Sequence, residues 1–227
     1  MAYLPAQRLR LYRNFKAIDA ADYHGIIRYF EEHEDDLRDL DECEYFDCAY
    51  AYAEALFAVG SYSQALVMVD HLLEWVIVHN LMWWGGRDVF AHLLWRKAEA
   101  LTCQGEWTRA EYVLGEYVKL YPFERRGWRL LNRCLLRQRP AWLRLCWAGS
   151  MALVFVSLAA AAAELFVVRP FFRSYEEEIG MAQHLFMSLA LLTAVGGEGY
   201  HWYHCRRKVR TLAKQIRARR NQRKCAY

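Results

Sequence analysis

Two small groups of residues near the ends of the chain have the types and spacing that could support metal chemistry. His201, His204 and Cys205 fall within little more than one helical turn, a spacing that could hold a metal ion, but no second ligand pair follows nearby. Cys43 and Cys48 stand four intervening residues apart and are interpreted as ordinary thiols of a reducing compartment. Neither group predicts a metal site.

The segment Gly196-Gly197-Glu198-Gly199 is the one glycine-rich run that could be mistaken for a phosphate loop. It follows an apolar stretch and precedes aromatic residues, a context that favours close packing between helices. The chain has no HExxH, GxSxG, P-loop or dinucleotide-binding motif. We therefore predict that the protein is not an enzyme and has no cofactor.

Three ionisable residues within apolar stretches are the better functional candidates: Glu164, His184 and Glu198. Charged groups in a membrane are costly and normally face a protein interior and pair. At 1.5 Å per residue, Glu164 and His184 would lie at similar depth, about 7–9 Å below one membrane surface. We predict that they pair, within one hairpin or between protomers; the alternative is that each reaches the surface separately. Glu198 has His201 one turn away as a candidate partner.

The elements that must position these residues are two apolar segments. Residues 145–168 contain one charged residue in 24, enough for a helix of about 36 Å that crosses a bilayer core of about 30 Å. Residues 179–203 form a weaker second segment, whose continuous apolar part, 185–197, also fits a buried core helix. Aromatic residues and then Arg206-Arg207-Lys208 follow it, which favours a second membrane span.

The distribution of basic residues predicts the topology. The connection 169–178 holds two bases and three acids, whereas both outer flanks are strongly basic. The positive-inside rule then places both termini in the cytoplasm, and we expect a bacterial inner membrane. The tail 206–227 should continue the second span or lie on the membrane surface, with anionic lipid as its partner. Its predicted basic contact residues are Arg206, Arg207, Lys208, Arg210, Lys214, Arg217, Arg219 and Arg220.

An acidic run opposes this tail. Residues 31–47 hold ten acids, and residues 206–224 hold ten bases, within a chain of formal net charge +4. The basic pI therefore comes from the tail, and nucleic-acid binding rests on charge alone. The acidic run is a solvated surface or a site for a basic partner, and the tail of the same or a neighbouring chain is one such partner.

Residues before the apolar segments repeat a pattern of small residue, apolar residue, glycine, aromatic residue and alanine. The pattern occurs twice, around Gly60 and Gly105. Pro122 closes the second copy. The small residues should let two helices approach closely, and each glycine should end the first helix at a tight turn. The repeat-defining residues are Ala53, Gly60, Tyr62 and Ala65 in the first copy and Ala98, Gly105, Trp107, Ala110 and Pro122 in the second.

This pattern resembles the tetratricopeptide repeat (TPR), a helix–turn–helix unit of 34 residues. The two glycines lie 45 residues apart, so about eleven residues are extra, and residues 76–86 should supply a longer helix and a loop. Its Trp83-Trp84-Gly85-Gly86 segment is either a partner-binding tip or a loop folded over the core. An earlier degenerate copy lies near Tyr23, and a third begins at Trp128. The resemblance implies a helical solenoid that binds a protein or peptide.

The sequence thus predicts an all-α protein with three parts: a cytoplasmic TPR-like domain over residues 1–140, a two-helix transmembrane hairpin over 141–205 and a basic tail over 206–227. The favoured function is a membrane-anchored adaptor that recruits a protein partner. The alternative is a small oligomeric membrane effector or channel whose helical domain senses a signal.

Overall fold

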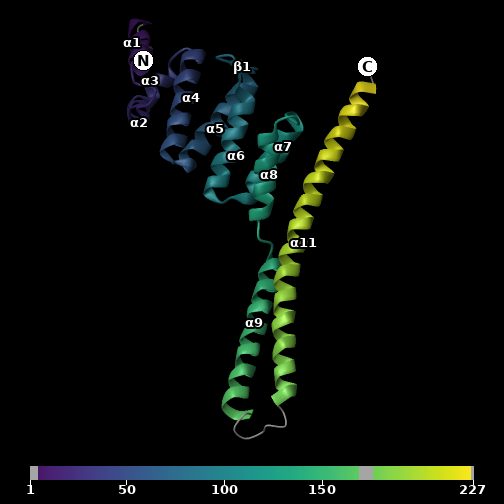
Figure 1. The fold of residues 1–227 in the computed structure, drawn as a ribbon. Coiled ribbons are helices and arrows are strands. Elements are labelled where there is room, and N and C mark those ends of the chain that lie inside the picture. Colours follow the sequence, from purple (N-terminus) through teal and green to yellow (C-terminus); the bar gives the residue numbers. More distant parts are fainter. Residues whose placement is uncertain (1–4, 169–175, 226–227) are drawn as a thin grey trace. The chain divides into compact units, whose positions relative to one another are not determined.

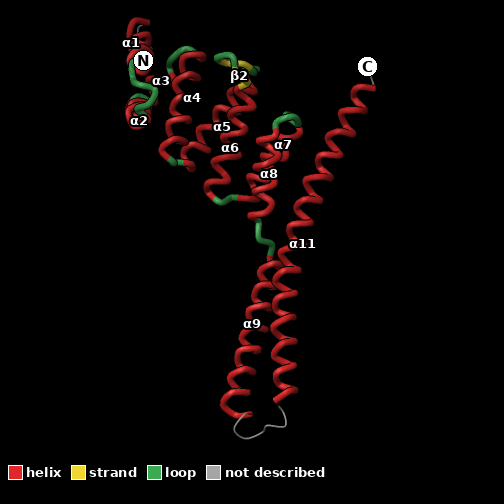
Figure 2. Tube along the Cα trace, viewed as in Figure 1, coloured by secondary structure: helices red, strands yellow, loops and turns green. Residues whose placement is uncertain are grey.

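The computed structural model describes the backbone of residues 5–168 and 176–225 and the side chains of residues 10–166 and 180–218. The fold is all-α, as the sequence predicts, apart from two strands of two residues each (Figures 1 and 2). In chain order the elements are α1 (Pro5–Lys16), α2 (Tyr23–Glu32), α3 (Glu34–Arg38), α4 (Glu42–Val59), α5 (Tyr62–Val78), β1 (Trp83–Trp84), β2 (Arg87–Asp88), α6 (Val89–Gln104), α7 (Trp107–Leu120), α8 (Arg125–Arg137), α9 (Ala141–Ala163), the π-helical turn η1 (Glu164–Val168) and α11 (Glu176–Cys225).

The chain divides into two compact units. The first, Met1–Cys134, is called the helical domain, and the second, Leu135–Tyr227, is called the hairpin unit. The helical domain is built from consecutive packing: α2 contacts α4, α4 contacts α5, α5 contacts α6 and α6 contacts α7. In the hairpin unit α9 packs along α11. The division falls within α8, a few residues before the predicted boundary at residue 140.

The turns at Gly60 and Gly105 are built alike. Gly60 follows α4 with φ of +87° and Gly105 follows α6 with φ of +79°, a left-handed conformation that costs glycine little because it has no Cβ. In each turn the next amide donates to the carbonyl five residues back, Ser61 to Leu56 and Glu106 to Leu101, both at 3.0 Å. This is the Schellman arrangement, which satisfies the last helical carbonyls.

The helix after each glycine begins at the predicted aromatic residue, α5 at Tyr62 and α7 at Trp107. Tyr23 likewise begins α2, which follows α1. The small residues of the pattern are fully buried, as close packing between paired helices requires. These residues are Ala53, Ala65, Ala98 and Ala110. Pro122 follows the end of α7, and its carbonyl accepts a hydrogen bond from the Trp128 indole at 3.0 Å.

The extra residues between the two glycines form a short hairpin that the sequence analysis did not predict. β1 and β2 pair antiparallel, with Trp84 opposite Arg87. Gly85 and Gly86 join them with φ of +56° and +75°, the two positive angles of a type I′ turn. Trp84 packs edge-on against the buried Phe46 at 5.5 Å between ring centroids, whereas Trp83 is exposed. One tryptophan therefore covers the core, and the other stays available on the surface.

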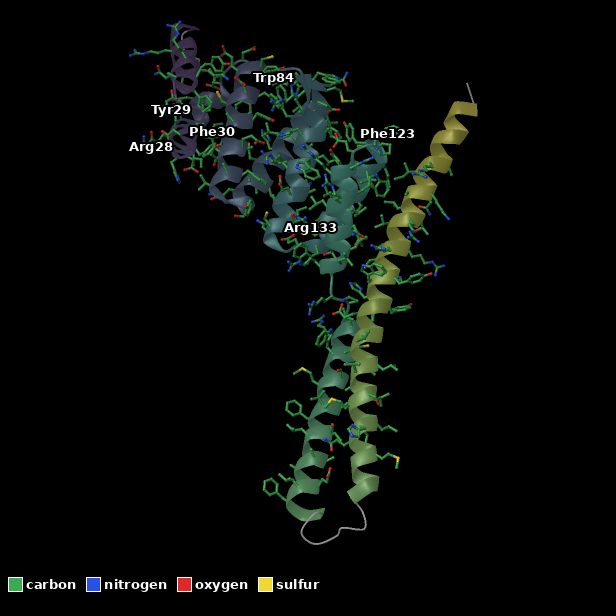
Figure 3. All side chains as sticks on the ribbon, in the orientation of Figure 1. Arg28, Tyr29, Phe30, Trp84, Phe123 and Arg133 are labelled. Atoms are coloured by element: carbon green, nitrogen blue, oxygen red, sulfur yellow. The ribbon has the colours of Figure 1, made fainter. Side chains whose placement is uncertain are left out.

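Aromatic side chains form the centre of the helical-domain core. Phe46 is fully buried, with the Trp75 ring stacked on it at 4.8 Å. Phe30 of α2, labelled in Figure 3, stacks on Tyr52 of α4 at 4.2 Å. Such ring pairs contribute about 0.5–1.5 kcal/mol each beyond burial alone. They hold α2, α4 and α5 together at the end of the domain that carries the acidic run.

The acidic run has a structural explanation at its helix ends. Acids occupy the first turns of α3 and α4, where the positive end of the helix dipole stabilises them. Asp41 caps α4 by accepting the amide of Cys43 at 3.4 Å. Asp47, later in α4, accepts a hydrogen bond from Tyr12 at 2.8 Å and pairs with Lys16. Many of the ten acids thus support the fold.

Candidate functional site: the helical hairpin and a groove on the helical domain

The hairpin unit presents large apolar side chains to its surroundings. Two segments, Ala141–Phe166 and Gly180–Ala218, are long and apolar enough to cross a membrane by length and composition. In each segment only 11% of the most apolar stretch of 18 residues is buried. Figure 3 shows side chains standing out from both helices. The exposed apolar residues include Leu145, Met151, Phe155, Leu158, Leu165, Phe166, Met181, Leu185, Leu191, Leu192 and Val195.

Several small and polar side chains lie between the two helices, beside the buried Leu143. Ser150 of α9 donates to the Ala190 carbonyl of α11 at 3.0 Å, and Ser157 donates to the Gln183 carbonyl at 3.3 Å. Both serines are buried. Gly197 faces Cys146 so closely that a Cβ there would lie 3.2 Å from the Cys146 Cβ. These three contacts fix an antiparallel register and bring the backbones close, as small residues do between membrane helices.

Aromatic and ionisable residues gather where α9 begins. The Trp147 indole donates to Glu198 at 2.9 Å, so Glu198 has a hydrogen-bond partner on the other helix, whereas the sequence analysis suggested His201. Trp142 packs edge-on against Tyr200 and His201, at 5.5 and 6.0 Å between ring centroids. This group joins the two helices by polar as well as apolar contacts.

His201 and Cys205 form a buried pair one turn apart. The Cys205 thiol lies 3.7 Å from His201 Nε2 and donates to the Leu135 carbonyl at 3.4 Å. His204, the third residue of the predicted group, is exposed. Within the described residues no group of three or more His, Cys, Asp or Glu side chains could hold a metal ion.

The other two predicted intramembrane residues lie on different helices. Glu164 is half-buried in η1 at the end of α9, and His184 is exposed on α11. Their pairing therefore stays a prediction. The segment 169–175, which contains most of the predicted outer loop, lies outside the described residues.

The basic tail continues α11 without a break. Arg206 lies over the Trp202 ring at 3.7 Å, a cation–π contact. All described basic side chains of the tail are exposed, namely Arg206, Arg207, Lys208, Arg210, Lys214 and Arg217. The side chains of Arg219 and Arg220 lie outside the described ones. The predicted apolar face is less exposed than the bases, because Val209, Leu212, Ala213 and Ile216 are all half-buried.

A polar network links α4 to α6 in the helical domain, and no sequence spacing indicated it. Arg96 makes two hydrogen bonds to Glu54, at 2.9 and 2.5 Å, and a third to Glu99 at 3.1 Å. Tyr50 bonds His92 at 2.9 Å. Burial lowers the pKa of His92, although the carboxylate of Glu54, 3.8 Å away, acts in the opposite direction. This network joins the first helices of the two repeat copies.

The described cysteines are free. Burial raises the pKa of the Cys48 thiol to about 12 and that of Cys134 to about 11. Both thiols therefore stay protonated near neutral pH and are poor nucleophiles. Cys43 and Cys103 are exposed.

A groove of about 800 Å³ opens between α3, α4 and α5 on the helical domain. Tyr45, Met68 and Trp75 line it, and Glu34 and Glu42 stand among its charged residues. A second groove, of about 880 Å³, lies across α5, α6 and α7 and shares Val67 with the first. Neither groove was predicted, because each is built from residues on three different helices.

Comparison with known proteins gives no relative from which a function could be transferred. No protein-family model, no curated protein and no solved structure matches the chain significantly. The TPR resemblance therefore stays a prediction, and any function must be argued from the geometry described above.

Proposed function

We propose that the protein is a membrane-anchored adaptor. In this proposal α9 and α11 cross the membrane as a hairpin, and the helical domain recruits a protein partner at the cytoplasmic face. The observation that carries the proposal is the arrangement of the hairpin unit, with serines and a histidine buried and large apolar side chains exposed. In water such a continuous apolar surface would drive association, whereas lipid chains are its natural surroundings.

Two further features support the orientation and the role of the tail. Aromatic residues, including Trp142, Trp147 and Trp202, gather near the start of α9, at the same end of the hairpin as the tail. Such residues are typical of a membrane–water interface. The bases that follow would then lie in the cytoplasm, where each contributes about 1 kcal/mol of attraction to an anionic surface. We propose that the tail binds anionic lipid there, in a bacterial inner membrane.

The repeated turns support a protein partner rather than a small-molecule substrate. Two helix pairs with equivalent Schellman turns, led by Tyr62 and Trp107, are what a TPR-like solenoid needs, and such solenoids present extended binding surfaces. The exposed Trp83 and the two grooves on α5 are surfaces of this kind.

The proposal can be tested in two steps in cells that express the full chain. Alkaline carbonate extraction should leave the protein in the membrane pellet, and release into the supernatant would contradict membrane insertion. Cross-linking and mass spectrometry should then identify at least one soluble protein that moves to the membrane fraction only when the chain is present. If no protein moves, the adaptor role fails while the anchor stands.

One observation favours a second candidate, an oligomeric membrane effector or channel. His184 is exposed on an apolar helix, and assembly of several copies would give it a protein environment. Molecular-mass determination in mild detergent separates the two candidates. A monomer supports the adaptor, and a ring-like oligomer supports the effector.

A further inference from the structure

The groove between α3, α4 and α5 has an apolar lining that is held in place by other contacts. Trp75 stacks on the buried Phe46 at 4.8 Å, and Tyr45 Oη lies 3.3 Å from His71 Nε2. Val67, at the edge of the groove, is 73% exposed. The groove thus offers rigid aromatic walls and a large uncovered aliphatic side chain, the arrangement that receives the apolar face of a helix.

The electrostatic surroundings of this groove are negative. Glu34 and Glu42 line it, and Arg38, which pairs with Glu34 at 2.5 Å, is the basic residue among them. Residues 31–47, which pass around the groove, hold ten acids and that one arginine. Within the described side chains only some of these acids have a basic partner, and a surface with an excess of one charge attracts ligands of the opposite charge and repels like charges. Anionic lipid headgroups and nucleic acids are therefore disfavoured here.

We propose that this groove binds a basic amphipathic helix. The inference rests on the proposed adaptor function and deepens it, because it names the chemical class of the recruited partner. A ligand that matches both properties places aliphatic residues on Tyr45, Met68 and Trp75 and holds its bases against the acidic run. The chain contains a segment of this chemistry in its own tail, where Val209, Leu212 and Ile216 share one face. The bases Lys208, Arg210, Lys214 and Arg217 occupy the other faces.

A labelled peptide of residues 206–225 is therefore a suitable probe. We expect it to bind the full-length protein, held in neutral detergent at low salt, with a saturable rise in fluorescence anisotropy. Raising the salt should weaken binding because the charges are partly exposed. Replacing Glu34 alone by lysine should weaken it several-fold. Replacing Glu34 and Glu42 together should weaken it by about tenfold or more, since each tenfold corresponds to about 1.4 kcal/mol, two charges are reversed and the net charge changes by four units.

Glu116→Lys is the matched control for Glu34→Lys. The Glu116 side chain is 45% exposed and pairs with Lys119 one turn away, much as Glu34 is 48% exposed and pairs with Arg38, but Glu116 does not line the groove. We expect Glu116→Lys to change the affinity less than twofold. A peptide with the same composition, in which the aliphatic residues are distributed around the helix, should bind several-fold more weakly. Equal binding of that peptide would overturn the amphipathic part of the proposal.

A photo-cross-linking residue at Gln64, which is exposed and lines this groove but not the second one, gives a second measurement that guards against competition from the tail of the full chain. We expect cross-links from position 64 to residues 206–225, and none from the same group placed at the exposed Leu120. Absence of both saturable binding and these cross-links would overturn the proposal, as would binding of the peptide to anionic vesicles alone. Neither readout depends on membrane insertion, so failure here is distinguishable from failure of the anchor.

Discussion

The two units of the chain distribute polar and apolar side chains in opposite ways. In the helical domain the buried side chains are aromatic, aliphatic, alanine or cysteine, with Phe46 and Leu72 among those that are fully covered. In the hairpin unit the buried side chains include Ser150, Ser157 and His201 beside Leu135 and Leu143, while many large apolar side chains, such as Phe155 and Leu158, are exposed. No serine, threonine, histidine or charged side chain is buried among the described residues of the helical domain.

This difference is what we expect if, as proposed, the helical domain lies in water and the hairpin unit lies between lipid chains. In water, burying apolar area drives folding, so that a helical domain collects such residues inside. Between lipid chains there is no such drive, and helices associate through close packing and hydrogen bonds. The hydroxyl-to-carbonyl bonds of Ser150 and Ser157 and the close approach at Gly197 are contacts of the second kind. The first three predictions below compare a substitution in one unit with a matched substitution in the other, and the last compares two serines of the hairpin unit.

The largest difference should follow from truncating phenylalanine. Phe46→Ala removes the fully buried centre of the helical-domain core and should destabilise that domain by about 3–5 kcal/mol. Phe155→Ala, at a position 66% exposed on α9, should change the stability of the hairpin by less than about 1 kcal/mol in detergent. Denaturant unfolding followed by near-ultraviolet circular dichroism compares them. Similar losses at both sites would mean that Phe155 belongs to a conventional core.

A charge introduced on the surface of the hairpin unit should cost more than a charge introduced on the surface of the helical domain. Leu158→Arg places a guanidinium on α9, near the middle of the predicted span 145–168, and should raise the apparent free energy of membrane insertion by about 3 kcal/mol. Val78→Arg, at a position even more exposed to solvent on α5, should cost no more than about 0.5 kcal/mol. The fraction of each variant that resists alkaline extraction measures the effect. If Leu158→Arg behaves like Val78→Arg, then α9 is not surrounded by lipid.

A smaller effect is expected at the glycines. Gly60→Ala forces a Cβ into a left-handed conformation at φ of +87° and should destabilise the helical domain by about 1–2 kcal/mol. Gly149→Ala, in the middle of α9 where a Cβ would meet no atom within 4 Å, should be neutral or slightly stabilising. Thermal unfolding of each variant provides the comparison. A neutral Gly60→Ala would show that the turn tolerates another conformation.

The smallest effect should come from the hydrogen bonds inside the hairpin. Ser157→Ala removes the bond to the Gln183 carbonyl, and membrane double-mutant cycles give about 0.6 kcal/mol for such a bond. Ser188→Ala is the control, because Ser188 is exposed and bonds within its own helix to Leu185. Steric-trapping measurements in detergent have the sensitivity for this difference. Equal losses of stability in the two variants would show that the hydrogen bond from Ser157 to the other helix does not stabilise the hairpin.

Local chemistry made part of the fold predictable from the sequence. Gly60 and Gly105 were expected to end their helices because a tight left-handed turn is a property of a few neighbouring residues. The β1–β2 hairpin was missed, although consecutive glycines at positions 85 and 86 are the usual signal of a type I′ turn. Its flanking strands of two residues are too short to show alternation.

Contacts between distant residues could not be predicted in the same way. The Trp147–Glu198 hydrogen bond depends on the register between α9 and α11, which the serine contacts and Gly197 set together. The Arg96–Glu54 pair and the groove near Val67 depend on how several helices pack. The sequence indicated Glu198 as a candidate but suggested His201, an ionisable residue one turn further along the same helix, as its partner.

Cysteine accessibility in intact cells tests the membrane anchor most directly. A cysteine introduced at position 174, in the predicted outer loop, should react with a membrane-impermeant maleimide added outside. The natural Cys43 and Cys103, both exposed on the helical domain, should react only after the membrane is permeabilised. Peptide mass spectrometry reads out each site separately. Labelling of Cys43 or Cys103 before permeabilisation, or protection of position 174 until then, would contradict an anchor that holds the helical domain in the cytoplasm.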